Sequence, residues 1–127
     1  MGKFLLITFA FFGVLFSCNN DDDNTQNNEK HQLENMLKEI TTLSLSEQCT
    51  DASKWRFVEI GAKSCGGPSG FIAYSINIDT TQFLKKVANY TKAQDDYNKK
   101  WGSVGDCSII KPPKKINCKD GIPTFEY

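Results

Sequence analysis

The stretch "FIAYSINIDTTQFLKKVANYTKAQDDYNKKW", residues 71–101, decides the fold because it joins a strand pattern to a helix pattern. Its first eight residues carry apolar side chains at alternate positions, which predicts a strand over 71–78. One face of that strand is expected to hold Ile72, Tyr74, Ile76 and Ile78, with Ser75 and Asn77 on the other.

The helix pattern starts at Asp79, which suits an N-cap, and Gln82 follows three residues later as in a capping box. Apolar side chains then recur at spacings of three and four, so we expect a helix that ends near Trp101 and is closed by Gly102. Such a stripe indicates core packing rather than a platform for stacking a ligand. It consists of Phe83, Leu84, Val87, Tyr90, Gln94, Tyr97 and Trp101.

Two further elements are predicted before this unit. Residues 29–43 carry apolar side chains at helical spacing and predict an amphipathic helix that docks on the domain or on a partner. Residues 55–60, "WRFVEI", are rich in aromatic and β-branched side chains and predict a strand. The stripe of the helix is Leu33, Met36, Leu37, Ile40 and Leu43.

The end of the chain carries a hairpin signal. Asp120 and Gly121 separate two short segments of β character, and Asp-Gly is a favoured two-residue hairpin turn. Together the elements predict an α+β fold, in which a small antiparallel sheet packs against one long helix, braced by two disulfides, after a disordered tether. Residues 29–127 are long enough for one small domain with a modest core.

Five cysteines are an odd number, so an exported chain needs a separate role for one of them. The strand over 71–78 and the helix after it have comparable lengths, so the helix end returns beside the strand start. Cys65 and Cys107 lie just outside those two points and are predicted to pair, which leaves Cys49 for Cys118. The alternative, in which Cys49 pairs with Cys65 and Cys107 with Cys118, closes shorter loops and stays open here.

The stretch "SCGGPSGF", residues 64–71, could hold a ligand or form a tight corner. It leads into a strand rather than a helix, and Pro68 removes one backbone amide, so it is a poor phosphate loop. No second cysteine stands close enough for a redox pair, and the single histidine, His31, is far from Cys65 in the sequence. We interpret the stretch as a corner whose glycines adopt positive φ beside a disulfide.

The first residues have the layout of a secretory signal, because Lys3 precedes an apolar run over residues 4–16. As a helix that run spans about 20 Å, short of the ~30 Å of a bilayer core. The run ends in "LFSC", residues 15–18, which resembles the lipobox of bacterial lipoproteins. The resemblance implies a signal peptide over 1–17 and a lipid on Cys18 that anchors the protein to a membrane.

Residues 18–28 are rich in Asn and Asp, so we expect a disordered tether. The acidic run of residues 21–23 resembles the surface-export signal of Bacteroidota-type lipoproteins, and it would serve equally as a solvated spacer. Calcium binding is disfavoured there because the glycine and the distal glutamate of a calcium loop are missing. The resemblance implies an outer-membrane protein, lipid-anchored on the cell surface, with the periplasmic face as the alternative.

The chain has 15 basic and 15 acidic residues, so its charge gives no reason to expect a nucleic-acid partner. No motif predicts a metal or a cofactor. Residues 60–68, "IGAKSCGGP", with Asp106, Cys107 and Cys118, resemble a family of small disulfide-stabilised domains of bacterial lipoproteins with a Cys-Gly-Gly-Pro signature. The resemblance covers about residues 49–127 and implies a shared disulfide frame without an activity.

These patterns favour an interaction module that binds a protein or glycan on a lipid anchor in the cell envelope. A protease inhibitor is one form of such a module, because a disulfide-braced loop can resist cleavage. The lysines among the candidates also have a simpler interpretation, as groups that discourage strand pairing at an edge. The candidate contact residues are Ser69, Lys111, Lys114 and Lys115.

Two other classes of function remain. A structural or accessory envelope lipoprotein without a discrete ligand would show a featureless polar surface. An enzyme is disfavoured because no set of nucleophile, base and orienting group is recognisable, although Glu59, Asp106, Asp120 and Glu126 are acidic candidates. A cavity with Asp106 beside the glycine loop would favour catalysis, whereas an exposed patch with aromatic side chains would favour binding.

Overall fold

The computed structural model describes residues 21–127, so the expected signal peptide and the lipidation of Cys18 lie outside the described residues. Within that range no helix has the length and apolarity needed to cross a membrane. The α+β class is confirmed, with two long helices and two separate two-stranded antiparallel sheets. The elements are α1 (Asp21–Ser44), η1 (Ala52–Lys54), β1 (Trp55–Ile60), β2 (Gly70–Ser75), α2 (Thr80–Trp101), β3 (Lys115–Lys119) and β4 (Ile122–Glu126).

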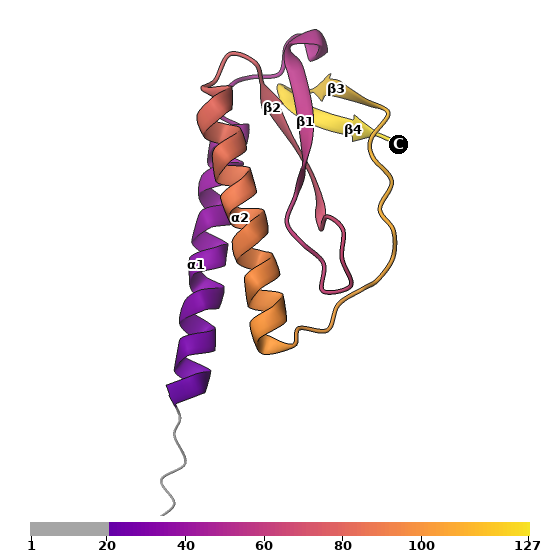
Figure 1. The fold of residues 1–127 in the computed structure, drawn as a ribbon. Helices are drawn as coiled ribbons and strands as arrows, with labels where there is room; N and C mark the ends of the chain where they lie inside the picture. Colours follow the sequence, from indigo (N-terminus) through magenta and orange to yellow (C-terminus); the bar gives the residue numbers. More distant parts are fainter. Residues whose placement is uncertain (1–20) are drawn as a thin grey trace, which may run out of the picture.

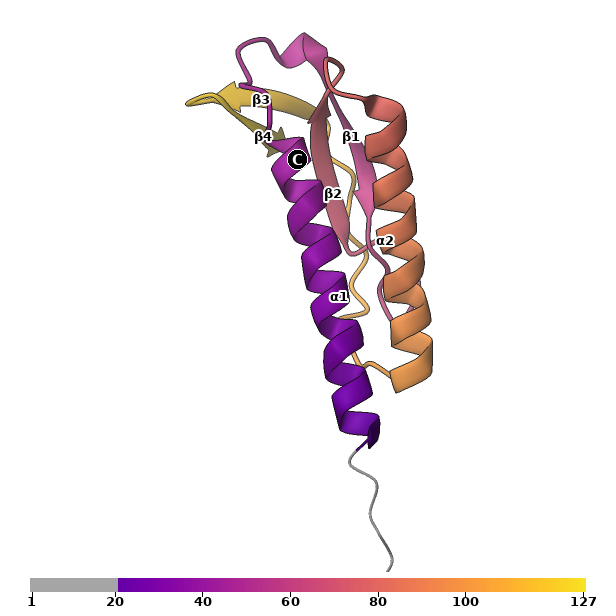
Figure 2. The same cartoon turned by 90° about the vertical axis from the view of Figure 1, so that its left-hand side faces the viewer.

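The elements form three layers. Figures 1 and 2 show α1 and α2 side by side along one face of the β1–β2 hairpin, with the β3–β4 hairpin near one end of its other face. The segment between α2 and β3 runs back along the side of the molecule away from the helices (Figure 1). The β1–β2 hairpin is therefore the central layer, and its two faces are covered by different elements.

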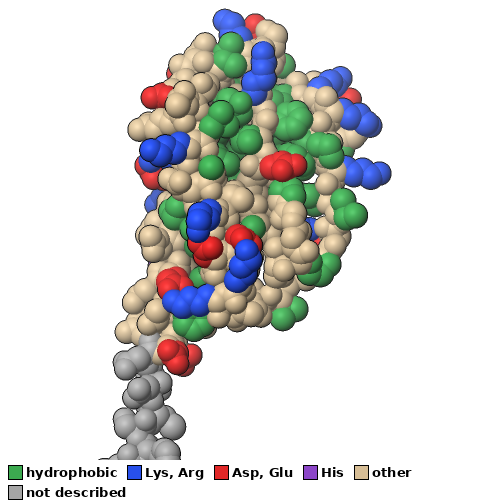
Figure 3. All heavy atoms as spheres, in the orientation of Figure 1, with side chains coloured by type: hydrophobic (Ala, Val, Ile, Leu, Met, Phe, Trp, Pro, Cys, Tyr) green, Lys and Arg blue, Asp and Glu red, His purple; other side chains and the backbone are tan. Residues whose placement is uncertain are grey.

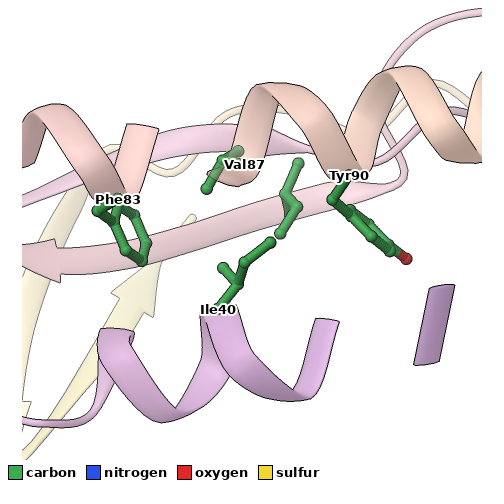
Figure 4. Close-up of a cluster of buried hydrophobic side chains, with 5 residues drawn as sticks. Ile40, Phe83, Val87 and Tyr90 are labelled. Carbon is green, nitrogen blue, oxygen red and sulfur yellow. The ribbon is translucent and has the colours of Figure 1, made fainter. Parts of the chain in front are cut away.

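The helix-facing side of β1 and β2 builds the larger core. Ile40 of α1 meets Phe83, Val87 and Tyr90 of α2 beside Ile60 at the end of β1 (Figure 4). Ile40 and Phe83 are each 1% exposed. Burying a side chain of this size contributes about 1.5–3 kcal/mol relative to leaving it in water. Leu37 and Leu84, predicted as members of the two apolar stripes, are instead 38% and 37% exposed.

The opposite side of the β1–β2 hairpin packs against the β3–β4 hairpin. Trp55 and Ala73 are buried there together with Cys49, whose sulfur is bonded to Cys118 of β3. Ile116 and Phe125 pack against the same cluster. This second core explains why β1 carries apolar side chains on both faces.

The local signals for α2 and the last hairpin are confirmed. The Asp79 side chain accepts a hydrogen bond from the Gln82 backbone N–H at 2.9 Å, and Gly102 closes α2 in the left-handed conformation with φ 59°. Asp120 and Gly121, with φ of 52° and 78°, form the turn between β3 and β4. Two central residues with positive φ are what the favoured two-residue hairpin turn requires.

The strand expected over 71–78 is wrong at its end, because β2 stops at Ser75. β1 begins at Trp55, which pairs with Ser75, so no strand residue lies opposite the next positions. The chain turns instead: the Asn77 N–H donates to the Ser75 hydroxyl at 3.2 Å. Ile76, expected on the apolar face, is consequently exposed.

The disordered tether expected over 18–28 is wrong for residues 21–28, which form the first turns of α1. Asp22 and Asp23 lie within α1 with exposed side chains. Glu29, the first residue after the expected tether, contacts Lys100 and Trp101 at the end of α2. A contact between residues so far apart in sequence cannot be read from local composition.

Candidate functional site

The glycine loop that ends β1 is fastened to α2 and to the segment after α2. Gln94 Oε1 accepts hydrogen bonds from the Ala62 N–H at 2.7 Å and from the Ser69 hydroxyl at 3.1 Å. The loop is bonded through Cys65 to Cys107, with the two Cα atoms 5.5 Å apart. Both predicted disulfides are therefore present, and the hydroxyl of Ser69, a candidate contact residue, is engaged in holding the corner.

The glycines act as expected in this corner. Gly66 and Gly67 have φ of 94° and 82°, a region that glycine adopts readily and other residues rarely do. Gly61, at the end of β1, has φ of 76°, and its N–H donates to the Thr91 hydroxyl at 2.9 Å. The interpretation of the loop as a tight corner beside a disulfide agrees with this geometry.

A polar cavity of about 410 Å³ lies between the glycine loop and the segment after α2. Asp106, an acidic candidate, lines it together with Lys63, Ser69 and Ser108. The Asp106 carboxylate accepts hydrogen bonds from the hydroxyl and the backbone N–H of Ser108, and these bonds lower the pKa of Asp106. The lowered pKa keeps the Asp106 carboxylate ionised at neutral pH. This is the arrangement, a cavity with Asp106 beside the glycine loop, that was named above as favouring catalysis.

The lysine candidates are not gathered around Ser69. Lys111 and Lys114 are exposed, and their ammonium groups have no partner within residues 21–127. Lys115 pairs with Glu126 at 3.1 Å and lines a separate cavity beside β1. The hydrogen bond from Asn117 and the contact with Lys115 lower the pKa of Glu126.

The remaining acidic groups do not form a catalytic or metal-binding cluster in the described part of the chain. Asp95 and Asp96 each pair with a lysine on their own helix, Lys99 and Lys92. Among residues 21–127 no group of three or more His, Cys, Asp or Glu side chains is placed to hold a metal ion.

An apolar groove, which the sequence did not predict, runs between α2 and β1. This α2–β1 groove has a volume of about 720 Å³. Figure 3 shows hydrophobic side chains gathered over the upper half of α2 and the neighbouring strand, with charged side chains lower on α2. Its apolar lining comes from Val58, Ala62, Pro68, Leu84, Val87 and Ala88, and its polar lining includes Glu59, Thr91, Lys92 and Asp95.

A row of four aromatic rings crosses the other side of β1. Phe57 of β1 lies between Phe71 of β2 and Phe125 of β4, with ring centroids 5.9 Å and 6.0 Å away. Phe125 also contacts Tyr127, with centroids 6.3 Å apart. The three Phe rings are half-buried and Tyr127 is 64% exposed. We call these four residues the aromatic row.

Apolar and aromatic side chains gather on these two surfaces, which is the feature named above for a binding surface. The binding role itself stays a prediction. Two features of the sequence could have indicated the groove and the aromatic row. Phe57 and Val58 put apolar side chains on both faces of β1, and Leu84 widens the stripe of α2 beyond what one contact face needs. Leu84, predicted to be core, is 37% exposed and lines the groove.

The comparisons with known proteins leave the site to be argued from its own geometry. No family model matches the chain, and neither a curated protein nor a solved structure matches it. The resemblances to bacterial lipoproteins given above therefore remain predictions.

Proposed function

We propose that this protein is a lipid-anchored lipoprotein of the bacterial cell envelope whose folded domain binds another macromolecule. The observation that carries the proposal is the pair of apolar surfaces on the two sides of β1, the α2–β1 groove and the aromatic row. Two disulfides and the hydrogen bonds of Gln94 hold the elements around it. A preordered apolar surface loses less entropy on binding than a mobile one.

The anchor rests on the sequence alone. The apolar run over residues 4–16 and the "LFSC" stretch support lipidation of Cys18, and the four remaining cysteines pair with one another. With all four engaged in disulfides, Cys18 is the single thiol left for the lipid. The acidic run of residues 21–23 supports display on the cell surface, with the periplasmic face as the alternative.

Binding is favoured over catalysis by the character of the surface. Ligand sites are lined mainly by apolar and aromatic side chains, and the lining of the α2–β1 groove is mainly apolar. In the polar cavity the Asp106 carboxylate is already bonded to the hydroxyl and the backbone N–H of Ser108, and its lowered pKa makes it a weaker base. The lysines at 111, 114 and 115 lie away from the groove lining and are assigned a solubilising role.

The proposal is tested in two arms in a bacterial host that lipidates exported proteins. In the first, cells are fed an alkyne fatty acid, and the wild-type chain is expected to be labelled while Cys18→Ser is not. In the second, a photo-crosslinking amino acid replaces Leu84 in the groove, which is 37% exposed, or Leu37 on α1, which is 38% exposed. A discrete crosslinked product at position 84 but not at 37 is expected.

The outcomes separate the alternatives. An unlabelled wild-type chain contradicts the anchor. A labelled chain that gives no product at either position contradicts the binding role and would indicate a structural lipoprotein without a discrete ligand. Equal products at both positions would show that the groove is not the binding surface.

A further inference from the structure

The strand β1 has a free edge beside the α2–β1 groove. Among residues 21–127 its backbone pairs only with β2, in a two-stranded antiparallel sheet. The N–H of Ile76 donates to the C=O of Lys54 at 2.9 Å. Lys54 and Ile76, which lie opposite each other just beyond the strand ends, are therefore a hydrogen-bonded pair. Since such pairs alternate along an antiparallel ladder, Trp55, Phe57 and Glu59 direct their backbone groups away from β2.

Two of these three residues have unused backbone groups. The N–H of Trp55 donates to the Ala52 C=O and its C=O accepts from the Arg56 side chain, so Trp55 is satisfied. For Phe57 and Glu59, no backbone hydrogen bond beyond the β1–β2 ladder is found anywhere in residues 21–127. Their two N–H and two C=O groups form a short template on which another strand could pair.

A strand laid along this edge would place its side chains on both apolar surfaces. Paired residues of neighbouring strands point to the same face of a sheet. A residue opposite Val58 would therefore project on the helix side, over Leu84 and Val87 in the groove. A residue opposite Phe57 would project on the other side, onto the aromatic row.

The negative charge of Glu59 at the free edge of β1 indicates which side chain a binding partner would place there. Glu59 is exposed, lines the groove, and its carboxylate has no hydrogen-bonding or ionic partner within the described chain. It shares a face with Phe57, two residues before it on the strand. Opposite charges on directly opposed residues stabilise a strand pair, so a basic side chain is favoured opposite Glu59.

We propose that β1 binds an extended peptide segment of another protein as an added antiparallel strand. The segment carries a basic residue opposite Glu59, an aliphatic residue opposite Val58 and an aromatic residue opposite Phe57, in that order along its chain. The inference rests on the proposed binding function, and it specifies the kind of partner that the groove and the aromatic row would bind. Main-chain bonds would supply the affinity, and the groove and the aromatic row would supply the selectivity.

A second copy of this chain fits the edge less well. Antiparallel pairing of two β1 strands about Val58 uses the free groups of Phe57 and Glu59, and it would oppose Glu59 to Phe57 of the other copy and Arg56 to Ile60. Neither charge would then face its opposite, and Glu59 would remain unpaired beside apolar groups, which is costly. The edge is therefore assigned to a different chain that brings a basic residue.

The test selects displayed eight-residue peptides on the full-length chain, purified in mild detergent with its disulfides intact. Selected peptides are expected to show the order basic, aliphatic, aromatic. Hydrogen exchange with a selected peptide bound is expected to slow at the amides of Phe57 and Glu59 and to leave the amide of Trp55 unchanged. N-methylation of the peptide amides that face β1 is expected to abolish binding.

Two substitutions probe the side-chain contacts. Leu84→Glu is expected to weaken binding about tenfold, since it removes apolar contact and introduces charge into the groove, while Leu37→Glu on α1 leaves it unchanged. Glu59→Lys is expected to shift the selected peptides from a basic to an acidic residue at the first position. A lost charge preference without this shift would contradict the assigned role of Glu59.

The remaining outcomes overturn the inference. Binding without slower exchange at Phe57 and Glu59 would show that the peptide docks through side chains alone. Slower exchange at these amides on raising the protein concentration alone would assign the edge to a second copy. Failure to select any peptide, while the crosslink at position 84 still captures a partner, would reject strand addition and leave the proposed function standing.

Discussion

The indole Nε1 of Trp101 donates a hydrogen bond to the carboxylate of Glu29 at 2.7 Å, and Lys100 pairs with the other carboxylate oxygen. These contacts join the first turns of α1 to the last turn of α2. They lie directly after a segment, residues 21–28, whose composition, rich in Asn and Asp, would by itself favour disorder. The order of residues 21–28 is therefore expected to depend on the charge of Glu29.

Acid is expected to release the start of α1 before the rest of the domain unfolds. Hydrogen bonds from Lys100 and from Trp101 lower the pKa of Glu29 from its usual 4.5. A lowered folded-state pKa stabilises the folded form above pH 4.5, and this contribution is lost as pH falls through the lower value. Hydrogen-exchange protection factors at residues 22–28 should then drop while those in β1 persist.

Glu29→Gln should reproduce this loss of protection at neutral pH. The matched control is Glu34→Gln, which removes an exposed carboxylate of the same helix whose partner is His31. Protection at residues 22–28 that survives both acid and Glu29→Gln would show that the start of α1 is held by something other than this carboxylate.

Removing the two disulfides should destabilise the domain unequally. In the chain-entropy model, loops of 69 and 42 residues give each disulfide about 4 kcal/mol. Cys49 is also 2% exposed within the second core, whereas Cys65 and Cys107 lie at the surface. Urea unfolding should show a larger loss of stability for Cys49→Ala with Cys118→Ala than for Cys65→Ala with Cys107→Ala. Equal losses would mean that core packing around Cys49 adds nothing.

Gly61→Ala should be more destabilising than an ordinary surface substitution. Gly61 has φ of +76°, and an added Cβ would lie 2.5 Å from Gln94 Oε1 and 2.8 Å from the Ser69 hydroxyl. A cost of about 1–3 kcal/mol is expected for a strained backbone conformation of this kind. Gly70→Ala is the control, because an added Cβ there meets no atom within 4 Å. Equal urea midpoints for the two variants would contradict the argument.

The sequence predicted those elements that are specified by neighbouring residues. Asp79 and Gly102 mark the two ends of α2, and Asp120 with Gly121 marks the last hairpin turn. The pairing of Cys65 with Cys107 followed from the matched lengths of a strand and the helix after it, although β2 is shorter than expected. A helix that returns along its strand brings those residues together in either case.

The features that the sequence did not predict depend on contacts between distant segments. The start of α1 needs Lys100 and Trp101, which lie more than 70 residues away. The exposure of Leu84 depends on the absence of a third strand beside β1, and nothing in the residues around Leu84 records that absence. The groove is thus a property of the assembled layers, and the periodicity of α2 alone could not separate its groove-lining residues from its core.

Replacing the three aspartates at 21–23 by asparagine is expected to leave the protein folded and lipidated but to reduce its display on the cell surface. Asparagine keeps the shape of aspartate and removes the charge that resembles an export signal, at a cost of a few tenths of a kcal/mol in helix stability. Digestion of intact cells with an added protease, followed by immunoblotting, measures the exposed fraction. The control variant carries Glu34→Gln and Glu47→Gln, which remove two exposed charges downstream of the run. If the asparagine variant is digested as completely as the wild type, the acidic run of residues 21–23 is a solvated spacer and not an export signal. If the wild type itself resists digestion until the outer membrane is opened, the protein faces the periplasm.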